Sequence, residues 1–364
     1  MSLAKILLLL LALITNVLGV CQKKNAGESD DVVIQCTCFR HSEDLVIDYD
    51  EFHNYAMAHT MEIRSCRIVD LQPNIFSKFK KLRTINVTEV DYLILHPNMY
   101  LPKTLDYLYL SKIGYLSGWL APEPNEGLLN TIESLQKLHL ENITVAAPPA
   151  SASSSFYNLQ ILEVMMIGVR FIGTLPQGAL EFNPSSFTEF NAIGCHFGDL
   201  QNNSIYINSA GNVIFYGCTF GKVESGAINV SGRQVAFIGN SFQHLEQRSS
   251  IMLNADSKLI FSVNVIKTVG DRYTLKIEMA EKASINVNAN EFPCFQDEMI
   301  RELYTKYSNS NCDATNCFPL QNNYCIHADG SKEFYHFQTN EKFSYLQHNF
   351  SQHAVPIVRS HLYI

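Results

Sequence analysis

The residues best suited to acid–base chemistry are His139 and Glu163, an imidazole and a carboxylate 24 residues apart. Such groups can act as acid and base in glycoside cleavage, which generally needs two carboxylates, or a metal with a basic residue. No second carboxylate or arginine joins them in the repeat described below, so a polar pair on a binding face explains them better. The sequence also lacks a Gly-x-Ser-x-Gly elbow, a His-Glu-x-x-His motif and a phosphate loop. We therefore expect no catalytic residue, no metal and no cofactor.

Both residues belong to an eight-residue phrase that recurs ten times between Met61 and Phe292. Apolar residues occupy its first, third and eighth positions, and a Cys, an Asn or a small aliphatic residue occupies the sixth. Alternation over the first three positions predicts a strand that buries every second side chain. The sixth positions, 22 to 30 residues apart, are Cys66, Val90, Ile113, Ile143, Ile167, Cys195, Cys218, Asn240, Asn264 and Asn290. A period of this size predicts a solenoid in which each turn supplies a parallel strand.

The inward positions of this repeat have structural roles. Ala192, Phe215, Phe237 and Phe261 should form one buried column along the solenoid axis. Buried asparagines at the sixth position can satisfy backbone groups on both sides, so Asn240, Asn264 and Asn290 predict an internal ladder. Cys195 and Cys218 fall on adjacent turns, where a disulfide is conceivable, but we expect buried free thiols.

The outward middle position of each strand gives a candidate binding row. It reads Glu62, Asn86, Tyr109, His139, Glu163, Asn191, Ile214, Ala236, Ile260 and Asn286. We expect Glu62, Tyr109, His139 and Glu163, with Arg64, Lys112 and Glu141 beside them, to form a binding surface. Taken singly, each is better explained as an ordinary solvent-exposed residue of its strand. The later part of the row is apolar, and soluble proteins seldom leave such a strip unused. Either the aromatic tail, with Phe334, Phe337, Phe343 and Tyr345, covers it, or a partner or second copy does; we favour the tail.

The segment Ile68-x-x-Leu71-x-Pro73-x-Ile75-Phe76-x-x-Phe79-x-x-Leu82-x-x-Ile85-x-Val87 resembles the extracellular leucine-rich repeat family. The resemblance implies a right-handed coil with a concave parallel sheet and a convex side of loops and short helical turns. From about residue 187 a second alternating segment appears in each turn, at residues 204–208, 227–231, 250–254 and 273–277, which looks like a right-handed parallel β-helix. The predicted fold is therefore a mainly β, right-handed parallel solenoid, leucine-rich-repeat-like over residues 61–186 and β-helix-like over residues 187–293.

The two ends of the chain indicate secretion and disulfide-stapled caps. Residues 1–19, with Lys5 before an apolar run, predict a signal peptide. Four cysteines lie near residues 20–60, the N-terminal cap, and four in residues 294–325, the C-terminal cap, before a tail of residues 326–364. These candidates for disulfides are Cys21, Cys36, Cys38 and Cys66, and Cys294, Cys312, Cys317 and Cys325, with the pairing left open. N-glycosylation sequons at Asn86, Asn142, Asn202, Asn229 and Asn349 fit the same compartment.

The net charge of −8, without long runs, argues against nucleic acid and anionic membranes as partners. No segment after the leader is long and apolar enough for membrane insertion. We expect a secreted, extracellular, non-enzymatic recognition protein whose rigid solenoid binds an extracellular protein or glycan. A homo-oligomer is compatible with the same sequence. The alternatives are a carbohydrate-active β-helix enzyme and a self-associating component of an extracellular matrix.

Overall fold

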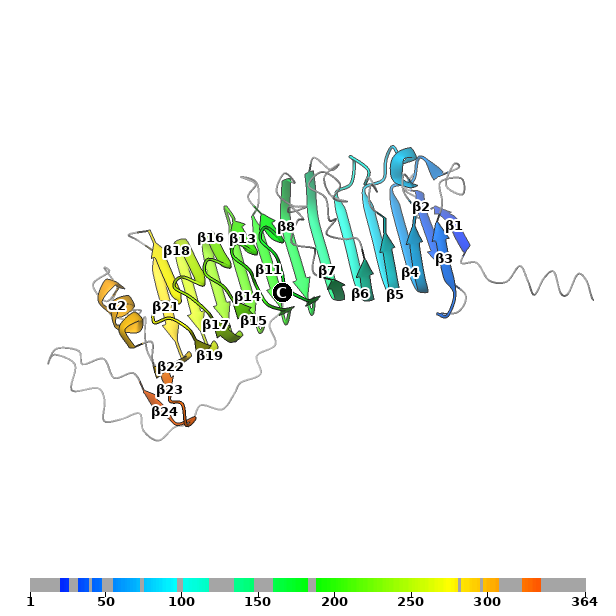
Figure 1. Ribbon diagram of the computed structural model, residues 1–364. Coiled ribbons are helices and arrows are strands. Elements are labelled where there is room, and N and C mark those ends of the chain that lie inside the picture. Colours follow the sequence, from blue (N-terminus) through cyan, green and yellow to red (C-terminus); the bar gives the residue numbers. More distant parts are fainter. Residues whose placement is uncertain are drawn as a thin grey trace, which may run out of the picture.

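Successive turns of the chain stack along one axis and form a parallel β-solenoid of about nine turns (Figure 1). The structure is a computed structural model that describes residues 20–25, 32–38, 41–47, 55–72, 75–96, 101–117, 134–146, 160–182, 188–280, 283–294, 297–307 and 323–334. The predicted signal peptide, Cys312, Cys317, Asn349 and the tail after Phe334 lie outside the described residues.

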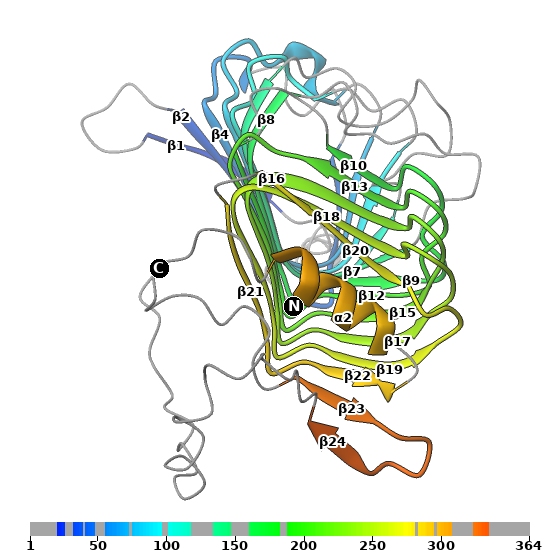
Figure 2. The same ribbon diagram turned by 90° about the vertical axis from the view of Figure 1, so that its left-hand side faces the viewer.

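Each turn bends at one residue with a left-handed backbone, directly before the sixth position of the repeat. These corner residues, with φ between 51° and 66°, are Ser65, Glu89, Lys112, Asn142, Gly168, Gly194, Gly217, Gly239, Val263 and Ala289. This conformation costs an L-residue about 1–2 kcal/mol and glycine almost nothing. Glycine accordingly occupies the corner in four consecutive turns. The chain does not leave the sheet there, as the repeat alone suggested, but turns into a second sheet (Figure 2).

The first half of the solenoid has strands that run through this corner. They are β4 (Thr60–Leu71), β5 (Thr84–Leu95), β6 (Tyr107–Ser117) and β7 (Ser134–Ala146). The inward residues Ile63, Val87, Leu110 and Leu140 align in one register and are buried. A short 3-10 helix, η2 (Ile75–Lys78), follows β4 and buries Ile75 and Phe76. This half therefore has the helical turn that the sequence led us to expect, but two sheets per turn.

The second half has three strands per turn. The second alternating segments form one of them, as predicted, and the short strand after each corner was not anticipated. The first sheet continues through β8 (Gln160–Ile167), β11 (Glu189–Ile193), β14 (Asn212–Tyr216), β16 (Ile228–Ile238), β18 (Ile251–Ser262) and β21 (Ser284–Asn288). After the corner come β9 (Arg170–Ile172), β12 (His196–Phe197), β15 (Thr219–Val223), β17 (Ser241–Leu245), β19 (Val265–Val269) and β22 (Glu291–Pro293). The third sheet contains β10 (Leu180–Phe182), β13 (Ile205–Asn208), the first parts of β16 and β18, and β20 (Leu275–Met279).

The register of the fifth turn differs from the prediction. Leu138 lies beside Val164, and Leu140 beside Met166, so the repeat there begins at Val164 and not at Leu162. Leu162 is 42% exposed, whereas Met166 is buried. Val169, which follows the corner Gly168, therefore takes the sixth position that the sequence pattern assigned to Ile167.

Stacked aromatic rings fill the core of the second half. Ala192, Phe215, Phe237 and Phe261 lie in one register and are fully buried, which confirms the predicted column. The ring centroids of Phe215 and Phe237 are 4.6 Å apart. Burying each such side chain contributes about 1.5–3 kcal/mol, and stacking turn on turn is what keeps the column dry.

The predicted asparagine ladder is present and one rung longer than expected. Asn240, Asn264 and Asn290 are buried, and each Nδ2 donates to a backbone carbonyl oxygen of the preceding turn, at 2.7–3.0 Å. Each also donates from Nδ2 to Oδ1 of the next asparagine, at 3.0 Å, and the last acceptor is Asn323. The ladder thus carries the repeat into the C-terminal cap.

Cys218 and Cys195 occupy the ladder position in the two turns before Asn240. Neither is disulfide-bonded, and both are buried. Cys218 Sγ donates to Ala192 O at 3.3 Å and Cys195 Sγ to Met166 O at 3.4 Å. The pKa of Cys218 is raised, mainly by a hydrogen bond with Cys195 and to a lesser extent by burial. This thiol therefore stays protonated.

The N-terminal cap is an antiparallel pair, β1 (Val20–Asn25) and β2 (Val32–Thr37), followed by β3 (Asp44–Ile47). The disulfide Cys21–Cys36 joins the pair, and Cys38–Cys66 ties it to the first turn. Cys66 is thus a disulfide partner and not a free ladder thiol. β2 and β3 both pair in parallel with β4, so the cap continues the solenoid.

The C-terminal cap covers the other end of the solenoid with a helix and a hairpin. Helix α2 (Asp297–Tyr307) lies across the end in Figure 2 and buries Met299, Ile300 and Leu303. It also supplies hydrogen-bond partners for backbone groups at the edge of β20. Leu275 N donates to Met299 Sδ, and Lys306 Nζ donates to Ile277 O. The hairpin of β23 (Tyr324–Ile326) and β24 (Lys332–Phe334) pairs with β22 and runs past residue 325, where we expected the cap to end.

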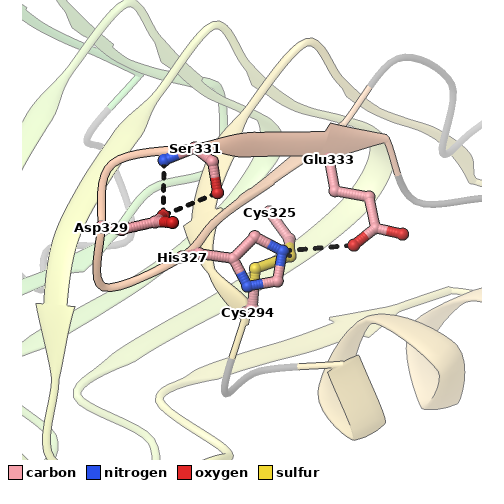
Figure 3. The surroundings of a disulfide bond; sticks show 6 residues. All are labelled: Cys294, Cys325, His327, Asp329, Ser331 and Glu333. Carbon is pink, nitrogen blue, oxygen red and sulfur yellow. Dashed lines mark hydrogen bonds and ion pairs between the residues drawn. A yellow bond between two sulfur atoms is a disulfide. The ribbon is translucent and has the colours of Figure 1, made fainter.

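A disulfide fixes this hairpin to the last turn (Figure 3). Cys294 is bonded to Cys325, and His327 Nε2 lies 3.9 Å from Cys325 Sγ and 3.2 Å from Glu333 Oε2. The two sulfurs and the imidazole lie close enough to hold a metal ion. Zinc, however, is bound by thiolates, and here the sulfur atoms are bonded to each other. The cluster in this form is a structural staple.

Candidate recognition surface

The outer face of the first sheet carries three columns of side chains that run the length of the solenoid. Along most strands their positions alternate with buried ones, so they point outward. Asn191, Ala236 and Ser262 belong to these columns but are buried among their neighbours on this face. The first column is Thr60, Thr84, Tyr107, Lys137, Glu163, Glu189, Asn212, Gln234, Lys258 and Ser284. The middle column is Glu62, Asn86, Tyr109, His139, Met165, Asn191, Ile214, Ala236, Ile260 and Asn286. The third is Arg64, Thr88, Ser111, Glu141, Ile167, Ile193, Tyr216, Ile238, Ser262 and Asn288.

Five of the seven residues that we predicted for binding meet in the first half of this face. Glu62, Tyr109 and His139 are in the middle column, and Arg64 and Glu141 are in the third. The Tyr109 and His139 ring centroids are 5.8 Å apart, and His139 Nε2 lies 3.4 Å from Glu141 Oε2. Strands of one continuous sheet hold all five side chains.

Glu163 is not where the sequence register put it. The two-residue shift of the fifth turn moves it to the first column, where Lys137 Nζ donates to its Oε1 at 2.6 Å. Met165 takes the place beside His139. His139 and Glu163 are therefore not neighbours in one column, as the sequence register had placed them.

Lys112 is also displaced from the binding row. It is a corner residue with φ of 52°, and its Nζ donates to Glu89 Oε1 at 3.2 Å. Hydrogen bonds from Lys112 and then from Ser65 lower the pKa of Glu89. These three side chains occupy successive corners, so Lys112 belongs to the edge of the sheet and not to its face.

The structure adds an aromatic ledge that the single-row prediction missed. Tyr107 and Tyr109 are two positions apart on β6 and therefore lie on the same outward face. Their ring centroids are 6.2 Å apart and their planes differ by 11°. Tyr107 Oη donates to Gln136 Oε1 at 2.6 Å, which fixes the first ring. Together with His139 these rings form a platform, here called the aromatic ledge. The Tyr-x-Tyr spacing of β6 was the available sequence signal.

Two carboxylates lie side by side in the first column, contrary to our expectation that none would join Glu163. Glu163 and Glu189 face each other on adjacent strands. Glu163 is paired with Lys137, and Glu189 Oε1 accepts a hydrogen bond of 2.8 Å from Asn191 Nδ2. Both groups thus have partners within the sheet.

The second half of the face is apolar in two of its three columns. We define the apolar outer face as Ile167, Ile193, Ile214, Tyr216, Ile238 and Ile260. Tyr216 is 49% exposed, and the five isoleucines are half-buried against their neighbours. Over the same strands the first column stays polar, from Glu189 to Ser284. The sheet therefore presents a polar, aromatic surface in its first half and an apolar one in its second.

Four of the predicted sequons lie on the surface. Asn86 is half-buried in the middle column beside Tyr109, and Asn142 is exposed at a corner. Asn202 is exposed, with its Nδ2 donating to Ser225 O at 2.6 Å, and Asn229 is half-buried on β16. A glycan at Asn86 would lie directly against the aromatic ledge.

Within the described ranges, none of the helices has the length and apolar character needed to cross a membrane. Comparison of the chain with protein-family models, with curated proteins and with solved structures gave no match.

Proposed function

We propose that this protein is a secreted, glycosylated and non-enzymatic recognition protein that binds an extracellular protein or glycan. The observation that carries the proposal is the aromatic ledge, which lies beside charged groups on the polar half of a continuous sheet. Tyrosine offers a large apolar ring with a polar tip, and such residues dominate binding energy at interfaces. The contact surface would comprise Glu62, Arg64, Tyr107, Tyr109, His139 and Glu141.

The scaffold supports this role because its strands are locked before any partner arrives. Binding to a pre-organised surface avoids much of the entropy that a flexible loop would lose. Three disulfides, Cys21–Cys36, Cys38–Cys66 and Cys294–Cys325, support an oxidising compartment, as does the leader predicted for residues 1–19. The short helix η2 supports kinship of the first half with extracellular leucine-rich repeat proteins, whereas its second sheet counts against it.

The test compares one tyrosine from each of two outward-facing ring pairs. The full-length protein is purified from a secreting eukaryotic host and screened against a glycan array and a panel of extracellular domains. For a ligand so found, Tyr109→Ala should weaken binding about tenfold or more. Tyr92→Ala is the matched control, because Tyr92 and Tyr115 also form a ring pair, at 6.3 Å, but on the second sheet. Equal effects of the two substitutions would contradict the proposal.

A carbohydrate-active enzyme is the second candidate, favoured only by the neighbouring carboxylates Glu163 and Glu189. Retaining glycosidases use two such groups close together. In this sheet Lys137 forms an ion pair with Glu163 and keeps it ionised, as a nucleophile must be. Glu189 would then have to act as the general acid. Release of reducing sugars from a polysaccharide panel, abolished by Glu189→Gln, would establish this activity in place of simple binding.

A further inference from the structure

The proposed function leaves the apolar outer face unexplained. It spans adjacent parallel strands from β8 to β18, which at a strand spacing of about 4.8 Å makes a strip roughly 20 Å long. Isoleucine side chains fill most of its two columns, and Tyr216 stands out of it at 49% exposure. Soluble proteins cover or use a surface of this kind.

One buried acceptor at the end of the strip lacks a donor among the described residues. Asn286 follows Ile260 in the middle column, on β21, the last strand of the first sheet. Its Oδ1 is inaccessible to solvent, yet none of the groups in the described part of the chain donates a hydrogen bond to it. An unpaired buried acceptor costs about 1–3 kcal/mol. A donor supplied by residues outside the described ranges would remove this cost.

We propose that residues 335–364 of the same chain dock across the apolar outer face. They continue directly from β24, whose partner β23 pairs with β22 at the end of the solenoid where β21 also lies (Figure 2). Thirty residues can span about 100 Å when extended, several times the length of the strip.

The composition of this segment matches the surface. It contains Phe337, Phe343, Tyr345, Leu346 and Phe350, together with a second apolar run at residues 354–358. Its charged residues are only Glu341, Lys342 and Arg359. Aromatic rings laid over isoleucine columns bury apolar area on both sides, at about 25 cal/mol per Å². Occupied in this way, the second half of the sheet is closed to partners, and recognition is confined to the polar half.

The experiment places a tryptophan reporter in the strip. In a full-length protein whose single tryptophan is replaced by Trp119→Phe, Tyr216→Trp reports on the apolar outer face, and Tyr92→Trp, at a site 52% exposed, is the control on the second sheet. Each is compared with the same chain ending at residue 334. Removal of residues 335–364 should shift the emission at position 216 to longer wavelength and speed its acrylamide quenching several-fold, with position 92 unchanged. A synthetic peptide of residues 335–364 should reverse both changes.

A full-length variant with Phe337→Ser, Phe343→Ser and Tyr345→Ser repeats the test without truncation, and an unchanged reporter at position 92 shows that the fold is kept. The triple variant should reproduce the shift at position 216. Equal emission at position 216 in all chains would overturn the proposal. So would a reporter that is protected in both lengths while light scattering shows a dimer, because the occupant would then be a second copy.

Discussion

Asn264 Nδ2 donates a 3.0 Å hydrogen bond to Asn290 Oδ1 on the next turn, and both side chains are fully buried. The same Nδ2 group donates to Phe237 O, and Asn264 Oδ1 accepts from both the backbone and the side chain of Asn240. Each asparagine thus satisfies groups of three turns at once. This makes the ladder a cooperative unit, in which the loss of one member orphans several buried polar groups.

Replacing Asn264 with Leu should therefore destabilise the protein by about 3–5 kcal/mol, since donors and acceptors on both neighbouring turns lose their partners. The measurement is chemical unfolding followed by circular dichroism. Asn254→Leu, at an exposed position of the same strand, is the control and should stay within about 0.5 kcal/mol of the parent. Similar costs at the two sites would show that the ladder contributes little.

Val263 should be a stabilising site. Its φ is 59°, a conformation that a β-branched residue adopts only under strain, and its side chain is 55% exposed. Val263→Gly should raise the free energy of unfolding by about 1 kcal/mol. The backbone strain that it removes from the folded state exceeds the entropic cost of a more flexible unfolded chain. The reverse change, Gly239→Val, tests the same corner one turn earlier, where an added Cβ would meet nothing closer than 3.9 Å. It should lower stability by about 1–2 kcal/mol, and a gain would disprove the strain argument.

The cap strand β3 is clasped to the first turn by a pH-dependent ion pair. Arg67 donates to both carboxylate oxygens of Asp44, at 2.8 and 2.7 Å. This hydrogen bonding, together with the charge of Arg67, lowers the pKa of Asp44 from its usual 3.8. A lowered carboxyl pKa stabilises the fold above the unfolded value, and that contribution disappears as the pH falls through the folded one.

Arg67→Gln should accordingly raise the pKa of Asp44 towards its usual value, as measured by carboxyl NMR titration. It should also make the stability of the cap less sensitive to acid below about pH 4. The pKa of Asp44 in the folded state would then lie closer to its value in the unfolded state. Glu89, whose pKa is lowered by Lys112 and Ser65, should titrate as before. An unchanged Asp44 titration would show that the clasp does not persist in solution.

The disulfide Cys294–Cys325 closes a loop with a sequence separation of 31 and holds the hairpin against the last turn. Replacing both cysteines with serine should cost about 2–4 kcal/mol. Each turn contacts only its neighbours, so the loss should be local. Hydrogen exchange should accelerate in β22 to β24 and α2 and stay unchanged in β4 to β7. Uniform acceleration would indicate that the solenoid unfolds as one unit.

The period of the repeat was enough to predict the solenoid, because a buried column such as Phe215, Phe237 and Phe261 leaves a direct imprint on sequence spacing. The fifth turn was misaligned because Leu162, Val164 and Met166 alternate equally well in two frames. Gly168 could have chosen between them, since glycine precedes the sixth position in the next three turns. Apolar alternation marks which side chains are buried, whereas only the corner marks where a turn begins.

The candidate surface was only partly accessible to sequence analysis for the same reason. Tyr109 and His139 were correctly placed side by side, but the shift moved Glu163 to Lys137 and brought Glu189 beside it. Asn323 escaped notice because helix α2 interrupts the period before it. Its signal was the pair Asn323-x-Cys325, which repeats Asn290-x-Phe292. Pairings of this kind depend on register across turns, which no single turn encodes.

One disulfide of each cap attaches to the repeat itself: Cys66 holds a sixth position, and Cys325 lies beside Phe292 at an eighth. A covalent stop therefore stands at each end of the stack, where fraying would otherwise begin. Unless these sulfur–sulfur bonds are reduced, neither an exopeptidase working inward nor a pulling force applied at a terminus can detach the first turn. We expect this architecture to give the protein a long lifetime in a protease-rich medium.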